Sequence, residues 1–222
     1  HAGRFLPANG RGKMNVRFTL VADGPSDSAL MPILTKLLRA DPRVTEIDGQ
    51  FAHPTTLPRV REGLAARAVA ALSLFPANLL FVHRDAERER HDVRRQEIME
   101  NLRELLQVRL FVPIVPVRMT EAWLLFDESA IRTAAGNPRG RTSLNLPRLQ
   151  DVESITDPKS SLYLALRTAC ELHGGALTKF NPREAAARVA DLIDDFSPLS
   201  GLAAFQCLRQ DLLAVLDRIA DN

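Results

Sequence analysis

The chain has 222 residues, of which 45% are apolar and 25% are charged, and its formal net charge is +2. This length suits one α/β domain with additions, and the apolar share is enough for a sizeable core. The near-neutral charge excludes a protein that is basic throughout, so any contact with nucleic acid must come from local clusters of basic side chains.

Three of the 29 basic residues precede Met14, in a stretch rich in Gly, Pro and Arg without periodicity. We interpret residues 1–13 as a tag or an upstream extension. Cys170 and Cys207 lie in amphipathic helical patterns, which favours core thiols in a reducing compartment over a disulfide. No apolar run is long enough to span a membrane and no secretory pattern opens the chain, so we expect a cytoplasmic protein without membrane contact.

The first predicted unit is a strand, a tight turn and a helix. Residues 16–22 (VRFTLVA) are β-branched and aromatic, which is typical of a strand, and residues 23–27 (DGPSD) form the turn before an apolar helical pattern. A weaker strand is expected over 45–51. A second helix is predicted from Thr56 to Leu72, with Arg67 on a face away from the core.

The second unit continues the alternation. Residues 78–82 read as a buried strand, followed by a long helix over 87–108 whose first turns are nearly all charged. Residues 110–117 resemble a strand that contains two prolines, which favours the edge of a sheet. A helix over 121–136 is closed by a glycine at position 136. The succession predicts a mostly parallel, doubly wound α/β sheet with helices on both faces.

The character of the chain changes after Gly136. Residues 137–154 read as a long ordered loop, and three helices follow, with joints at Gly174-Gly175 and Ser197-Pro198. These helices are expected over 157–172, 181–195 and 200–220. We therefore divide the chain into the extension 1–13, an α/β domain over 14–136, and a loop and helical C-terminal extension over 137–222 that packs on it.

Acidic and polar residues follow three of the predicted strands. Because open α/β sheets bind ligands at the carboxyl ends of their strands, we expect these side chains to meet at one edge. Carboxylate oxygens suit Mg²⁺, and two such ions can steady both the attacking and the leaving oxygen in phosphodiester cleavage. The residues concerned are Asp23, Asp27, His83, Asp85, Glu87, Arg118 and Glu121.

Three motifs at these strand ends resemble those of TOPRIM-like proteins: VADGPSD over 21–27, HRDAE over 83–87 and VRMTEAWLLFD over 117–127. The resemblance is nearest to a small TOPRIM-like family related to OLD-type nucleases, and it continues through GNPRG, LNLP and DPK. It implies a TOPRIM fold, a divalent metal, and nuclease or phosphoryl-transfer chemistry, often in bacterial defence against phage or other mobile DNA.

The resemblance also implies roles for individual residues. Asp23 occupies the position of the TOPRIM glutamate, Asp85 matches the second acid of the D-x-D pair, and His83 stands where the first acid would be. On this basis the predicted catalytic residues are Asp23, Asp85 and Glu87. The predicted ligands of Mg²⁺ or Mn²⁺ are Asp23, Asp85, Glu121 and His83.

Two departures from the family pattern leave a second hypothesis open. Asp23 is one methylene shorter than glutamate, and misplacement by about 1 Å can cost about a hundredfold in rate. The neutral imidazole of His83 suits Mn²⁺ or Zn²⁺ better than Mg²⁺. Either Glu87 and Glu121 complete the metal site, or the protein is a catalytically degenerate module that binds nucleic acid, a nucleotide or a partner protein of a defence system. A homodimer is left open.

Each candidate residue also has an ordinary structural role to consider. Asp27 is expected to cap a helix, Trp123 to lie in the core, and Glu121 either to bind metal or to pair with Arg118. The charged run after Glu87 is by default a solvated helix face. The basic residues predicted to contact phosphate or nucleic acid are Arg84, Arg118 and Lys159.

Overall fold

The computed structural model describes residues 12–107 and 109–221, so most of the predicted extension 1–13 lies outside the described residues. Four parallel strands form one sheet in the order β2-β1-β3-β4, which confirms the predicted parallel α/β fold of Rossmann-like type. The strands are β1 (Met14–Val21), β2 (Val44–Ala52), β3 (Leu79–His83) and β4 (Phe111–Ile114). The proline-containing strand β4 lies at an edge, as predicted.

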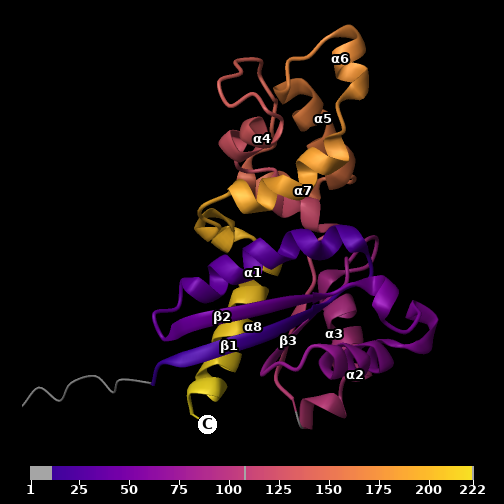
Figure 1. Ribbon diagram of the computed structural model, residues 1–222, viewed down its shortest axis with the longest axis vertical. Coiled ribbons are helices and arrows are strands. Elements are labelled where there is room, and N and C mark those ends of the chain that lie inside the picture. Colours follow the sequence, from indigo (N-terminus) through magenta and orange to yellow (C-terminus); the bar gives the residue numbers. More distant parts are fainter. Residues whose placement is uncertain (1–11, 108, 222) are drawn as a thin grey trace, which may run out of the picture.

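Helices cover both faces of this sheet (Figure 1). One face packs on α1 and α8, and the other packs on α2 and α3. The helices of the described residues are α1 (Leu30–Arg39), α2 (Leu64–Leu74), α3 (His91–Asn101), α4 (Glu128–Ala134), α5 (Pro158–Ala169), α6 (Gly174–Lys179), α7 (Pro182–Leu192) and α8 (Ala203–Ala220).

The register of the two central strands places the candidate site. Side chains of β1 alternate between the two cores, so that Phe18 lies on one face and Val21 on the other. Phe18 stands beside Leu79, and Val21 stands beside Val82. Asp23, two residues after β1, and His83, the last residue of β3, therefore lie at the same carboxyl edge.

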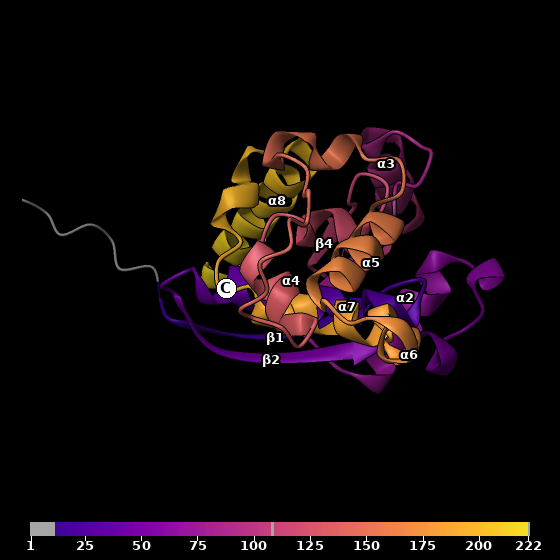
Figure 2. The ribbon, with the colours of Figure 1, turned by 90° about the horizontal axis from the view of Figure 1, so that it is seen from above.

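Helices α4 to α7 form a layer above α1 in Figure 1, and Figure 2 shows α5 and α7 crossing over the sheet. Trp123 is fully buried and meets the ring of Phe205 edge to face, with 5.1 Å between ring centroids, which confirms its predicted place in the core. The α8 helix continues the same core along the sheet. The C-terminal helices thus share one hydrophobic core with the α/β layer and bring α5 and α7 towards the carboxyl edge.

Two helix starts were predicted too early. The α2 helix begins at Leu64 and not at Thr56, because Pro58 and Gly63, whose φ is +95°, interrupt the pattern with 3₁₀ turns. The α3 helix begins at His91 and not at Glu87. Glu87 adopts φ +55°, and its N–H donates to the carbonyl of Arg118, so the backbone makes a turn there. The end of α3 is at Asn101, and the predicted end at Val108 lies outside the described residues.

The helix predicted over 121–136 is also wrong as a single element. A 3₁₀ turn (Thr120–Leu124) is separated from α4 by Asp127, whose carboxylate accepts from the N–H of Ala130 and so begins a new helix. The predicted closure is confirmed: Gly136 has φ +79°, and its N–H donates to the carbonyl of Thr133.

The C-terminal extension has one helix more than predicted. Gly174 and Gly175 were expected to be a joint, but they begin the short helix α6. The last helix starts at Ala203, after a 3₁₀ turn (Ser197–Gly201), and the helices predicted to end at 172 and 195 end at Ala169 and Leu192. No helix among the described residues combines the length and the apolar character needed to cross a membrane.

Candidate functional site

A polar cavity of about 310 Å³ lies at the carboxyl ends of β1 and β3, with walls from α3 and α5. The structure thus brings together most of the predicted site residues, which are far apart in the sequence. Asp27, which was expected at this edge as a helix cap, also lines the cavity, and so does Arg94 of α3, which was expected by default on a solvated helix face. The predicted residues at the cavity are Asp23, His83, Arg84, Asp85, Glu87 and Lys159.

The turn after β1 directs a second carboxylate into this cavity. The N–H of Gly24 donates to Oδ2 of Asp27 at 2.8 Å, and the N–H of Asp27 donates back to the Gly24 carbonyl at 3.3 Å. Asp27 therefore braces the turn itself and not the first turn of α1. Its side chain is almost completely buried, which places a carboxylate in a poorly solvated position.

Asp23 is held between two arginines. Its Oδ1 lies 3.1 Å from Arg67 of α2, and its Oδ2 lies 3.1 Å from Arg84, which follows β3. Arg67 is 1% exposed and also donates to the carbonyl of Ala22 at 2.7 Å. Both oxygens of Asp23 are therefore neutralised by cations of the chain itself. This arrangement does not support the predicted metal-ligand role of Asp23.

The burial of Arg67 contradicts the prediction that it lies away from the core. Its neighbours Leu64, Ala68 and Ala71 are buried on the same helix, so Arg67 lies within the inward stripe of α2. An arginine within such a stripe signals a buried acidic partner, since a buried charge is costly unless it is paired. The partner, Asp23, is 44 residues away and could not be identified from spacing alone.

His83 is completely enclosed below the cavity. Its Nδ1 lies 3.1 Å from the carbonyl oxygen of Ile114, a group that can only accept, so Nδ1 carries the proton. Its Nε2 faces two carboxylates: Oδ1 of Asp85 at 3.4 Å and Oδ2 of Asp27 at 3.8 Å. Burial by itself lowers the pKa of His83, but these carboxylates and the Ile114 carbonyl outweigh it and raise the pKa above its usual value.

The carboxylates of Asp27 and Asp85 differ in their hydrogen bonds. Burial raises the pKa of Asp27, and this exceeds the opposing effects of His83 and the Gly24 N–H. Oδ1 of Asp85 is buried and has no hydrogen bond within residues 12–107 and 109–221. A buried acceptor in this state is costly, and the group nearest to this oxygen is Nε2 of His83 at 3.4 Å, so the position favours a positive charge beside it. Asp27, His83 and Asp85 are called the Asp85 cluster below.

Glu121 and Arg118 are placed differently from the prediction. Glu121 pairs with Lys159 at 3.0 Å and not with Arg118. Arg118 adopts φ +63°, and its guanidinium lies 3.5 Å from the carbonyl oxygen of Glu87, outside the lining of the polar cavity. Glu87 is exposed at the cavity mouth. The predicted metal set of Asp23, Asp85, Glu121 and His83 is therefore divided among separate ion pairs.

Within the described ranges, no three His, Cys, Asp or Glu side chains are already arranged as a metal site. The Asp85 cluster comes nearest to one, with two carboxylates next to an imidazole nitrogen; His83 and Asp85 were predicted as metal ligands and Asp27 was not. These donors match the preference of Mn²⁺ for oxygen and imidazole ligands. Comparison with protein-family models, with curated proteins and with solved structures gave no match, so the TOPRIM resemblance rests on the motifs alone.

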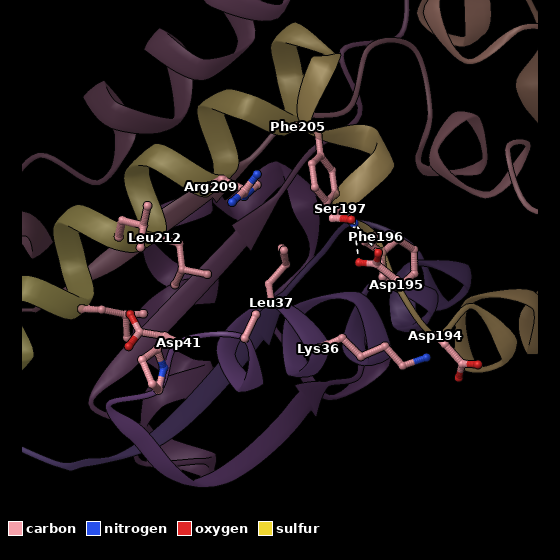
Figure 3. A pocket seen from close by; sticks show the side chains of 14 residues that line it. Lys36, Leu37, Asp41, Asp194, Asp195, Phe196, Ser197, Phe205, Arg209 and Leu212 are labelled. Atoms are coloured by element: carbon pink, nitrogen blue, oxygen red, sulfur yellow. Dashed lines mark hydrogen bonds between the residues drawn. The ribbon is translucent and has the colours of Figure 1, made fainter.

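A cavity of similar size, about 330 Å³, lies between α1 and α8 (Figure 3). Its walls are largely apolar, with Leu37 and Phe205 facing each other across it. The amino group of Lys36 donates to backbone carbonyls at the end of α7, including Asp191 at 2.9 Å, and Asp41 is paired with Arg43 at 2.6 Å. These charges have structural partners, and the cavity lacks the titratable cluster found at the carboxyl edge.

Proposed function

We propose that this chain is a TOPRIM-like, divalent-metal-dependent nuclease or phosphohydrolase that acts on nucleic acid in the bacterial cytoplasm, in defence against mobile DNA. The observation that carries this proposal is the Asp85 cluster in a cavity that also contains Arg84, Arg94 and Lys159. Acidic groups that can hold a cation or a proton lie there beside cations that can hold a phosphate.

A divalent ion would be held by Asp27, His83 and Asp85, whose side chains are not yet arranged as a metal site in the described ranges and would have to close around it. The buried Oδ1 of Asp85, which lacks a hydrogen bond there, is the donor that favours this position. When bound, such an ion polarises phosphoryl oxygens and lowers the pKa of water. Ion pairs keep Asp23 and Glu121 from this role. Asp27 would therefore be a metal ligand in place of the predicted ligands Asp23 and Glu121.

The remaining groups of the cavity act on the substrate. Lys159, Arg94 and Arg84 line it, and each is already paired with a carboxylate of the chain: Glu121, Glu97 and Asp23 respectively. A phosphate would be bound by the N–H donors that these pairs leave unused, since an ammonium has three and a guanidinium has five. All three members of the Asp85 cluster line the cavity, and Asp85, at 27% side-chain exposure, is the most exposed of them, whereas His83 is 1% exposed. Asp85 accordingly takes a proton from the attacking water, and His83 fixes the orientation of its carboxylate.

A specific observation favours a second function, a binding module without turnover. Asp23 and Glu121 are both neutralised by basic residues of the chain, which leaves one titratable cluster in place of the acids of three strand ends. Such a module would bind nucleic acid, a nucleotide or a partner protein. Free cysteines at 170 and 207 agree with a reducing compartment for either function.

The test is cleavage of single- and double-stranded DNA and RNA with Mn²⁺, with Mg²⁺ and with a chelator. We expect metal-dependent cleavage that falls at least about a hundredfold in Asp85→Asn, because loss of a general base costs about 10²–10⁴ in rate. Glu89→Gln is the matched control, since Glu89 is exposed in the same turn but does not line the cavity.

Cleavage that survives Asp85→Asn contradicts the proposed enzyme. Salt-sensitive binding of nucleic acid without cleavage under any metal selects the binding module instead.

A further inference from the structure

A second, smaller cavity adjoins the polar one. It measures about 180 Å³, and its walls come from the turn after β1, the 3₁₀ turn Thr120–Leu124, α5 and α7. Ser26 and Asp27 line both cavities. The ion pair between Lys159, which lines the first cavity, and Glu121, which lines the second, also links them. A ligand bound in one cavity is therefore within reach of the other.

The smaller cavity has a different chemical character. Leu124 and Ala186 are buried in its wall, and the aromatic ring of Tyr163 lines it, half-buried. Arg183 of α7 is exposed at the same cavity and carries a planar guanidinium. Flat heteroaromatic rings stack on tyrosine and on arginine, so these two side chains suit a planar ligand.

The wall of the smaller cavity also contains a buried hydroxyl group, that of Thr120. Thr120 is 5% exposed and lines the cavity, and its hydroxyl has no hydrogen-bond partner among the residues that the structure describes. A buried hydroxyl without a partner is costly, and a ring nitrogen or carbonyl at this position would satisfy it. The cavity is smaller than the ~300–1,000 Å³ typical of sites for drug-sized ligands, which fits one heterocycle.

The α5 helix carries one residue at each cavity, Lys159 at the polar cavity and Tyr163 at the smaller one. Lys159 and Tyr163 are four residues apart, so they lie on the same face of the helix with about 6 Å between their Cβ atoms. A sugar ring is the unit that separates a phosphate from a heterocycle in a nucleotide, and it suits this separation.

We propose that the smaller cavity holds the heterocyclic base of a nucleotide whose phosphate lies in the polar cavity, with Tyr163 and Arg183 as the ring contacts and Thr120 as the hydrogen-bonding partner. This inference rests on the proposed function for its phosphate site. It adds that the ligand is recognised one nucleotide at a time, through its base. The nucleotide is either free or a unit of a single strand.

The experiment measures binding to the full chain in the presence of a chelator, so that no cleavage occurs. The probes are adenosine 5′-monophosphate, ribose 5-phosphate, adenosine and a short single-stranded oligonucleotide. Stacking on an aromatic side chain contributes roughly fivefold to 150-fold per base, so the nucleotide is expected to bind tighter than ribose 5-phosphate by a factor in this range.

Variants assign this gain to the cavity. Tyr163→Leu keeps an apolar side chain and is expected to remove most of the gain, while the affinity for ribose 5-phosphate stays unchanged; Tyr163→Phe is expected to retain it. Arg183→Ala weakens nucleotide binding. Its matched control, Arg188→Ala, removes another exposed arginine of α7 that does not line the cavity and leaves binding unchanged.

The outcomes separate the two proposals. Equal affinity for the nucleotide and for ribose 5-phosphate, or an equal loss of both in Tyr163→Leu, overturns the base subsite and leaves the phosphate site standing. A third outcome is that adenosine binds as tightly as adenosine 5′-monophosphate, that Tyr163→Leu abolishes this binding, and that ribose 5-phosphate does not bind. This outcome supports the base subsite and contradicts the proposed phosphate site. A preference for the oligonucleotide over the mononucleotide identifies a strand as the source of the base.

Discussion

Two corners of the same sheet edge use aspartate in opposite ways. At the Asp23 corner, formed by Asp23, Arg67 and Arg84, a carboxylate after β1 is held by two permanently charged guanidinium groups. At the Asp85 cluster, a carboxylate after β3 faces an imidazole whose charge depends on pH. One corner therefore has a fixed charge balance, and the charge of the other changes with pH.

The difference comes from what packs behind each strand end. The α2 helix inserts a buried arginine next to Asp23, whereas β3 ends in a histidine that is enclosed next to Asp85. The position after a parallel strand brings an acid to the ligand-binding edge, but its neighbours in space decide whether it stabilises the fold or remains reactive.

The largest expected effect separates the two aspartates in activity. Asp85→Asn is expected to lower kcat/KM at least about a hundredfold, whereas Asp23→Asn, whose partners are structural, lowers it less than about tenfold. Cleavage kinetics at matched concentrations of folded protein give both numbers. Equal losses in the two variants would show that the corners act as one site.

The next effect is on stability. Arg67→Leu removes the buried partner of Asp23 and of the Ala22 carbonyl, so the free energy of unfolding is expected to fall by about 2 kcal/mol, with the value reduced by the partial exposure of Asp23. Urea denaturation measures it. Arg61→Leu, at an exposed position just before α2, is the control and is expected to change stability by less than about 0.5 kcal/mol. An equal loss of stability in Arg61→Leu would show that the effect does not come from the buried pair of Arg67 and Asp23.

The sequence predicted the sheet well, because its signals are local. Apolar runs mark β1 and β3, and the two prolines place β4 at the edge. Helix starts were less predictable. The periodicity before Leu64 and after Glu87 is interrupted by turns that depend on backbone geometry, such as the contact of Glu87 with the Arg118 carbonyl.

The sequence predicted where the candidate site lies, but it did not predict which side chains form ion pairs there. That Asp23, His83 and Asp85 meet follows from parallel strands alone. Which cation neutralises which acid depends on contacts such as Asp23 with Arg67 and Glu121 with Lys159, and these residues are 44 and 38 positions apart. A single sequence carries no local signal for such pairs, apart from an arginine in an apolar stripe.

A smaller effect distinguishes the corners by pH. Because the folded pKa of His83 is raised above its ordinary value of 6.5, its protonated form stabilises the fold below pH 6.5. This contribution is lost as the pH rises through the folded pKa. Thermal unfolding of the protein and of His83→Gln is measured from pH 5 to 9. The difference in Tm between them should be largest below pH 6.5 and should shrink as the pH rises through the folded pKa of His83. The corresponding difference for Arg67→Leu should stay constant, because a guanidinium does not titrate there.

The smallest expected effect concerns the link between the corners. Glu97 of α3 pairs with Arg84 and with Arg94, the latter at 2.6 Å, and its side chain is 38% exposed. Exposed pairs contribute about 0.2–1 kcal/mol, and because these pairs are partly exposed, Glu97→Gln is expected to lower the free energy of unfolding by about 1 kcal/mol. The substitution removes the partner of Arg94 and one of the two partners of Arg84, which stays paired with Asp23; both arginines line the polar cavity, and phosphate affinity measured by calorimetry should rise a few-fold and fall with salt. Glu100→Gln, an exposed acid on the same helix, is the control.

A fall in phosphate affinity in Glu97→Gln would contradict this prediction. It would show that Glu97 orients Arg84 and Arg94 for phosphate, and that the Asp23 corner, which contains Arg84, takes part in binding the ligand.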